Sequence, residues 1–115
     1  MLSKQYRMKF SSDFNETVRL GLCVVQSNIV VYGISIKNTN KITKVGLIVS
    51  KNIGNSVERH RVSRLIRHNT VFLLLNKNYP YMIVIRAKKN RNKMSFSLLR
   101  NQLQYAFNTL DIYHN

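Results

Sequence analysis

Short apolar runs rich in β-branched residues recur along the chain and predict strands. Two of them, LCVVQ at 22–26 and IVVYGISI at 29–36, are separated by only a short break. VGLIVS at 45–50 lacks apolar–polar alternation, so we expect this third strand to be buried on both faces. YMIVIRA at 81–87 follows the only proline and predicts a fourth strand. Polar segments between the strands, such as KNTNK at 37–41, read as loops.

Two segments near the ends of the chain carry apolar residues at helical intervals. Residues 11–20 predict a first helix, in which Phe14 and Val18 lie four apart on one face and a serine at the start is the cap. Residues 95–110 predict a last helix, also capped by a serine. Its apolar stripe consists of Leu99, Leu103, Ala106 and Phe107.

A long central helix is predicted to begin after Gly54. Asn55, with Glu58 three residues later, has the spacing of a capping box, and the helix should run to about Leu75, before the loop NKNYP at 76–80. On a helical wheel, one arc forms a stripe that should face the core. It consists of Val62, Leu65, Ile66, Phe72 and Leu73.

The order of elements is therefore αβββαβα. It predicts an α+β two-layer sandwich, with helices packed on a four-stranded sheet. The chain has 115 residues and neither an internal repeat nor a Pro- or Gly-rich linker, so we expect a single domain over residues 1–115.

The charge is far from the globular norm, with 19 Lys and Arg against 4 Asp and Glu, a formal net charge of +15. Such a charge favours a polyanionic partner, either nucleic acid or an anionic membrane. Nucleic acid is the better candidate, because many of the cations lie inside a predicted helix and not in a terminal tail. No apolar run approaches the length of a membrane span and the N-terminus lacks a signal-peptide core, which predicts a cytoplasmic protein.

The cations of the central helix gather on the side opposite its apolar stripe. Arg59 lies at the margin of this basic face. The face itself consists of His60, Arg61, Arg64, Arg67 and His68. It carries no acid, and guanidinium groups bind phosphates in a bidentate manner. Since strands surround the helix and no helix-turn-helix or zinc-finger pattern is present, we expect a rigid platform for folded RNA.

Catalysis by the protein itself is not expected. Hydrolysis of a phosphodiester with protein-held Mg²⁺ takes clustered carboxylates. The four acids, Asp13, Glu16, Glu58 and Asp111, are spread along the chain. His60, His68 and His114 lack metal-ligand spacing with Cys23, which reads as a small core residue, so no metal site in the protein is predicted.

SKNIGNSVERHRVSRLIRH at 50–68 resembles the signature of the bacterial ribonuclease P protein subunit, Ser-Lys-Lys-x-Gly-Asn-Ala-x-x-Arg-Asn-Arg-x-(Lys)-Arg-x-x-Arg. The matching positions are Ser50, Lys51, Gly54, Asn55, Arg59, Arg61, Arg64 and Arg67. The resemblance extends over nearly the whole chain. His60 departs from the usual Asn, Ser63 from Lys and Val18 from an aromatic residue. The first two remove a base-edge amide and a charge, which puts the affinity for RNA and its pH dependence in question but not the family.

The resemblance implies a protein subunit that partners a catalytic RNA. The complex would remove the 5′ leader from precursor tRNA by hydrolysis, with Mg²⁺ held by the RNA subunit and the substrate and with no further protein partner. It also implies an uncommon left-handed βαβ crossover around the central helix, contrary to the usual hand.

Two sets of binding residues follow from the resemblance. The RNA-subunit set is Asn55, Arg59, His60, Arg61, Arg64, Arg67 and His68. The leader-binding set is Phe14, Val18, Tyr32, Lys51 and Arg86, in which the rings would stack on bases and the cations would contact phosphates. For Phe14, core packing is an equal alternative.

Two other functions compete with this one. A structural RNA-binding protein of ribosomal type would share the composition but has no reason to carry the complete arginine signature. A membrane-surface peptide would need a free amphipathic helix and not a strand-rich domain.

Overall fold

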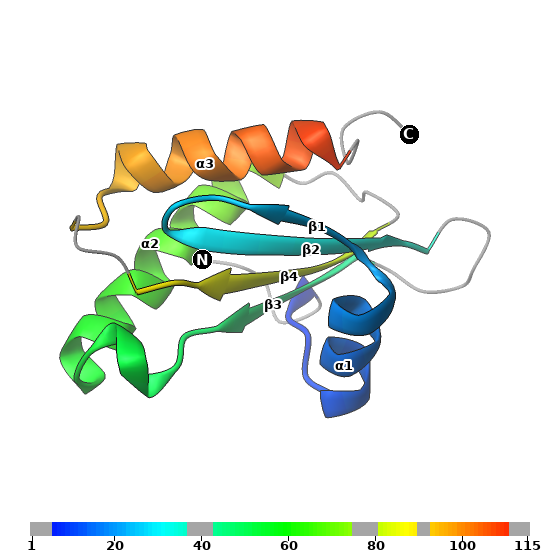
Figure 1. Ribbon diagram of the computed structural model, residues 1–115, viewed down its shortest axis with the longest axis horizontal. Helices are drawn as coiled ribbons and strands as arrows, with labels where there is room; N and C mark the ends of the chain where they lie inside the picture. Colours follow the sequence, from blue (N-terminus) through cyan, green and yellow to red (C-terminus); the bar gives the residue numbers. More distant parts are fainter. Residues whose placement is uncertain (1–5, 37–42, 75–80, 90–92, 111–115) are drawn as a thin grey trace.

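The four predicted strands form one mixed sheet in the computed structural model (Figure 1). The structure describes residues 6–36, 43–74, 81–89 and 93–110; the predicted loops at 37–41 and 76–80, Leu75, Asp111 and His114 lie outside these ranges. The strands are β1 (Leu22–Val25), β2 (Ile29–Ser35), β3 (Lys44–Ile48) and β4 (Tyr81–Ala87). Their order in the sheet is β1-β2-β4-β3, with β3 parallel to β4 and the other neighbours antiparallel.

The helices follow the predicted ranges closely. They are α1 (Ser11–Leu20), α2 (Ser56–Leu74) and α3 (Phe96–Thr109), with an additional short 3₁₀ helix, η2 (Lys51–Ile53), ahead of α2. The α2 cap is confirmed, since Asn55 Oδ1 accepts a hydrogen bond from the Glu58 N–H at 2.9 Å. Ser95 likewise caps α3 by accepting from the Leu98 N–H at 3.2 Å. The serine cap of α1 is wrong: the helix already includes Ser11, so Phe10 holds the cap position, without a side-chain bond.

Helices cover both faces of the sheet, which confirms the α+β class and adds a partial third layer (Figure 1). On one face, α2 and α3 bury the main core with the odd-numbered residues of β4, such as Ile83 and Ile85. On the other, α1 lies over a smaller cluster that includes Met82 and Val84. The connection β3–α2–β4 joins parallel neighbours; its expected left hand stays a prediction.

The apolar stripe of α2 was predicted correctly in part. Val62 and Ile66 are fully buried, as expected, but Phe72 is 46% exposed. In its place the stripe buries two polar residues, Asn69 and Thr70. Both are accommodated by hydrogen bonds: the Thr70 hydroxyl donates to the Ile66 carbonyl at 2.7 Å, and Asn69 Nδ2 donates to backbone carbonyls of both α2 and α3.

Two further predictions about burial were wrong for reasons of topology. The run at 45–50 forms β3, an edge strand, so Leu47 and Ile48 are only half-buried. The strands with buried residues on both faces are the two central ones, β2 and β4. Cys23 is exposed and not part of the core, because β1 is the other edge and α1 leaves this part of its face open. None of the described helices is both long and apolar enough to cross a membrane.

Candidate nucleic-acid interface

The outer face of α2 presents the predicted cations to solvent. His60, Arg64 and His68 are exposed and follow one another at four-residue intervals, so they form a row along the helix. Arg67 is half-buried beside this row. Within the described residues, none of these four side chains forms a hydrogen bond or an ion pair. Their donors are therefore available to an external anion.

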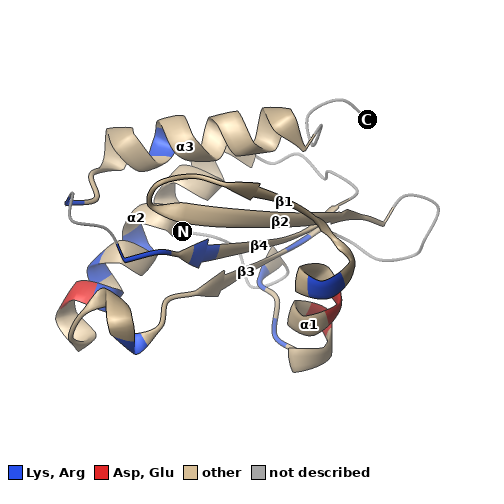
Figure 2. Cartoon of the chain, in the orientation of Figure 1, with Lys and Arg blue, Asp and Glu red and all other residues tan. Residues whose placement is uncertain are grey.

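The described acidic residues lie on α1 and in the first turn of α2, as the red segments of Figure 2 show. Asp13 and Glu16 belong to α1, on the opposite side of the sheet, and Glu58 lies in the first turn of α2. A helix face with free cations and few neighbouring carboxylates is suited to a chain of phosphates, because repulsion among the guanidiniums is relieved when the anion binds.

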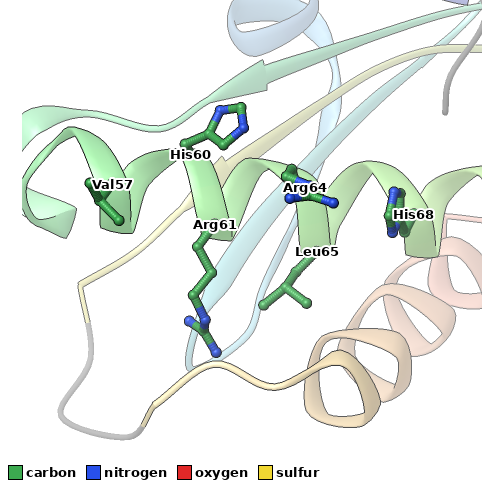
Figure 3. A pocket seen from close by; sticks show the side chains of 6 residues that line it. All are labelled: Val57, His60, Arg61, Arg64, Leu65 and His68. Carbon is green, nitrogen blue, oxygen red and sulfur yellow. The ribbon is translucent and has the colours of Figure 1, made fainter.

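Arg61 differs from its neighbours because it already has partners inside the protein. Its Nη1 donates to Glu58 Oε1 at 3.2 Å, and its Nη2 donates to the Met94 carbonyl at 2.6 Å. The expectation that the basic face carries no acid is wrong at this position, since Glu58 reaches it from three residues away. Arg61 thereby ties α2 to the segment before α3, and Figure 3 shows its side chain pointing toward that segment.

Two other residues of the predicted RNA-subunit set also have structural positions. Asn55 is the N-cap of α2, so its side-chain oxygen is already occupied. Arg59 is half-buried, and its Nε is buried without a partner among the described residues. Sequence spacing places both on the correct helix but does not separate capping from binding.

A shallow hollow of about 310 Å³ runs along this face of α2 (Figure 3). Its lining residues are Val57, His60, Arg61, Arg64, Leu65 and His68. Four of the six lining residues are histidine or arginine, the other two are apolar, and the hollow is open to solvent along the helix. It can accept an extended anionic backbone better than a small enclosed ligand.

The second predicted site lies on the opposite face of the sheet, beside α1. Tyr32 of β2 is half-buried there and lies opposite Cys23 of β1 and Val84 of β4. Arg86 lies two residues along β4 on the same face and is exposed, and its side chain has no hydrogen-bond or ion-pair partner among the described residues. The structure therefore brings Tyr32 and Arg86 together as diagonal neighbours on one face.

Phe14 combines the two roles that the sequence left open. It is half-buried and packs with Tyr32 against the small cluster under α1. The edge of its ring lies directly over Gly46 of β3, where a Cβ would overlap with the ring carbons Cε1 and Cζ. The Phe14 ring thus fills the space between α1 and the sheet, and part of the ring remains accessible to solvent.

The remaining leader-binding candidates are less closely associated. Val18 is 37% exposed and lies one turn after Phe14 on α1. Lys51 is exposed in η2, three residues after the end of β3, at the end of the sheet where Ile48 pairs with Arg86. Neither residue belongs to the apolar cluster that contains Phe14 and Tyr32.

Gly46→Ala should disturb this face specifically. The added methyl group overlaps the Phe14 ring and lies 3.0 Å from Met8 Sδ, so the ring must move. Overpacking of this kind costs about 1–3 kcal/mol of unfolding free energy, measured by thermal or denaturant melts. Phe14→Leu removes the overlapping ring atoms, so the double variant should recover part of the loss. If the loss of unfolding free energy in the double variant equals the sum of the two single losses, the ring does not occupy this position.

One aromatic–cation pair was not predicted from the sequence. The guanidinium carbon of Arg100 in α3 lies 3.9 Å from the ring centroid of Phe72 in α2. The sequence shows Arg100 as a basic residue within an amphipathic helix, but its aromatic partner becomes clear only when α2 packs against α3. Among the described residues, no three His, Cys, Asp or Glu side chains gather in a way that could hold a metal ion.

Comparisons with known proteins show the family to which the chain belongs. A family model described as Ribonuclease P matches residues 2–111. The ribonuclease P protein component of Mycobacterium ulcerans (strain Agy99) is 38% identical over 106 residues, which cover 90% of this chain and 88% of that protein. That of Mycobacterium leprae (strain Br4923) is 38% identical over 107 residues, with the same coverage.

Solved structures show the same fold. An RNase P protein from Staphylococcus aureus superimposes with a TM-score of 0.80 at 26% identity, covering 95% of this chain and 98% of the other. An RNase P protein from Thermotoga maritima has a TM-score of 0.68 at 18% identity, covering 87% and 93%, and supports the fold alone.

Proposed function

This chain belongs to the ribonuclease P protein family, and from that premise we propose that it binds a catalytic RNA subunit and helps it remove the 5′ leader from precursor tRNA. Members of the family are protein components of an endoribonuclease complex that processes tRNA. The single observation that carries the proposal is the row of His60, Arg64 and His68, with Arg67 beside it. These side chains have no partner among the residues that the structure describes, and they face away from the core.

The RNA subunit, and not the protein, would carry out the hydrolysis. The described acids lie on two different helices, Asp13 and Glu16 on α1 and Glu58 on α2, and Glu58 is engaged by Arg61. Two-metal phosphodiester hydrolysis needs carboxylates that converge on one point. Mg²⁺ would therefore be held by the RNA subunit and the substrate, and the protein would lower phosphate repulsion where these two RNAs meet.

The leader would bind on the opposite face of the sheet. Tyr32 and the accessible part of Phe14 offer ring faces that accept any base. Beside Tyr32, Arg86 offers a guanidinium that has no partner in the described part of the chain. Val18 would extend the apolar surface along α1, and Lys51 would contact a phosphate at the end of the sheet. The RNA subunit would therefore bind on the outer face of α2, and the leader of precursor tRNA on the face of the sheet beside α1.

A reconstituted cleavage assay tests the proposal. Precursor tRNA is incubated at low Mg²⁺ with the protein alone, with a bacterial ribonuclease P RNA alone, and with both, and the new 5′ ends are mapped. We expect cleavage at the mature 5′ end only when both are present, because at low Mg²⁺ the cations of the protein replace part of the screening.

Two results would contradict the proposal. Nuclease-free cleavage by the protein alone would show a catalytic site in the chain. No stimulation of the RNA subunit, together with tight binding to ribosomal RNA, would favour a structural protein of ribosomal type.

A further inference from the structure

Two exposed phenylalanines and an arginine form a ledge where α2 and α3 lie side by side. Phe72 of α2 is 46% exposed and Phe96 of α3 is 40% exposed. Arg100 lies one turn after Phe96 on α3, with its guanidinium over the Phe72 ring at 3.9 Å from the centroid. We call these three residues the α2–α3 ledge.

The ledge is held in place by a buried residue between the helices. Asn69 Nδ2 donates to the Leu65 carbonyl of α2 at 3.0 Å and to the Phe96 carbonyl of α3 at 3.1 Å. Because Asn69 is fully buried, the start of α3 is fixed beside the turn of α2 that precedes Phe72. The ledge is thus a rigid surface and not a chance meeting of two mobile side chains.

The ledge continues the hollow on α2. Leu65 and His68, which line that hollow, lie seven and four residues before Phe72 and therefore on the same side of the helix. Arg61, at the other end, reaches the Met94 carbonyl just before α3. Figure 3 shows Leu65 pointing toward the first turns of α3. A single strand lying in the hollow would meet the ledge without turning.

The chemistry of the ledge fits an unpaired nucleotide. Aromatic rings and arginine planes are the side chains on which splayed-out bases of RNA stack. The Arg100 guanidinium lies over one face of the Phe72 ring, and its own outer face can stack on a base. Arg100 in the ledge and Arg64 in the adjoining hollow supply positive charge for the phosphates of the same strand.

A second copy of this chain is a poor occupant for the same surface. Each copy carries a formal charge of +15, so two such faces repel each other. An acidic protein would match the charge but not the combination of stacked ring and guanidinium. Charge complementarity and exposed ring faces together favour RNA.

We infer that the interface with the RNA subunit extends beyond α2 onto α3, and that an unpaired base of that RNA stacks on the ledge formed by Phe72, Phe96 and Arg100. This inference rests on the proposed function and adds a specific contact to it. It also predicts that part of the recognition is insensitive to salt, because stacking involves no release of counterions.

The affinity of a bacterial ribonuclease P RNA for the protein, measured across a salt series, tests the inference. Phe72→Leu keeps an apolar side chain but removes the ring, so the affinity should fall about 10-fold with an unchanged slope of log K against log[salt]. Arg64→Ala should reduce both the affinity and the slope. Tyr105→Leu is the matched control, since Tyr105 is an exposed aromatic on the other side of α3, and it should change neither.

The outcomes distinguish failure of the ledge inference from failure of the proposed RNA-binding function. Unchanged affinity in folded Phe72→Leu and Phe96→Leu, with a loss in Arg64→Ala, would overturn the ledge and leave the proposed function standing. Unchanged affinity in Arg64→Ala as well would count against the RNA-binding face itself. Sedimentation provides a second readout: a wild-type dimer that Phe72→Leu dissociates would assign the ledge to self-association and overturn the inference.

Discussion

Replacing Arg64 and Arg67 together with alanine should lower the affinity for the RNA subunit by roughly 100-fold or more, because each loses a charge-assisted hydrogen bond to phosphate. The slope of log K against log[salt] should decrease by roughly 0.7–0.9 for each lost contact. Neither side chain has an internal hydrogen-bond partner among the described residues, so the melting temperature should hardly change. Filter binding across a salt series and a thermal melt measure the two quantities.

Arg61→Ala serves as the contrasting variant. Its guanidinium joins Glu58 and the Met94 carbonyl, so its removal should lower the free energy of unfolding as well as the affinity. If Arg64 and Arg67 also prove destabilising, or if all three variants bind RNA with unchanged affinity and slope, the basic face is a structural feature and not an interface.

Gln102→Met should destabilise the protein by about 2–4 kcal/mol, although it preserves the side-chain volume. Gln102 on α3 is buried and accepts a hydrogen bond from the Asn28 N–H at 3.1 Å, while its Nε2 donates to Asn28 Oδ1 at 2.9 Å and to Ser27 Oγ at 3.1 Å. Methionine cannot replace these bonds. Each buried group left without a partner costs about 1–3 kcal/mol. Denaturant unfolding measures the loss.

Gln104→Met is the matched control, because Gln104 lies on the same helix and is exposed. It should change stability by less than about 0.5 kcal/mol. Equal stability of the two variants would show that the link between α3 and the β1–β2 turn is not a significant part of the fold.

The repeating patterns of the sequence predicted the elements, but not which of their faces stay open. Strand β4 follows from its β-branched apolar run, and helix α3 from helical spacing, almost to the residue. Cys23 has the apolar neighbours of a core residue, yet β1 is an edge strand and its side chain is exposed. Strand order decides this, and strand order depends on long-range pairing that no local pattern contains.

The candidate site shows a similar division. Spacing placed Arg64 and His68 on the outer face of α2 correctly. It could not distinguish Arg61, which is committed to Glu58 and Met94, since Met94 is distant in sequence. For Phe14, the contact with Gly46 explains why neither core nor surface was a complete description.

The central claim is that α2 faces the RNA subunit while the opposite face of the sheet faces the leader. Cleavage by tethered hydroxyl-radical probes tests it most directly. The chain has one cysteine, Cys23, which is exposed opposite Tyr32 on the leader face. A second probe position is Val57→Cys in a Cys23→Ser background, because Val57 is 75% exposed and lines the hollow on α2.

Each labelled protein is first shown to support cleavage of precursor tRNA, and the sites of radical cleavage are then mapped in the assembled complex. The account predicts cuts in the 5′ leader from Cys23 and cuts in the RNA subunit from position 57. Leader cuts of equal strength from both positions, or cuts from Cys23 confined to the RNA subunit, would contradict it.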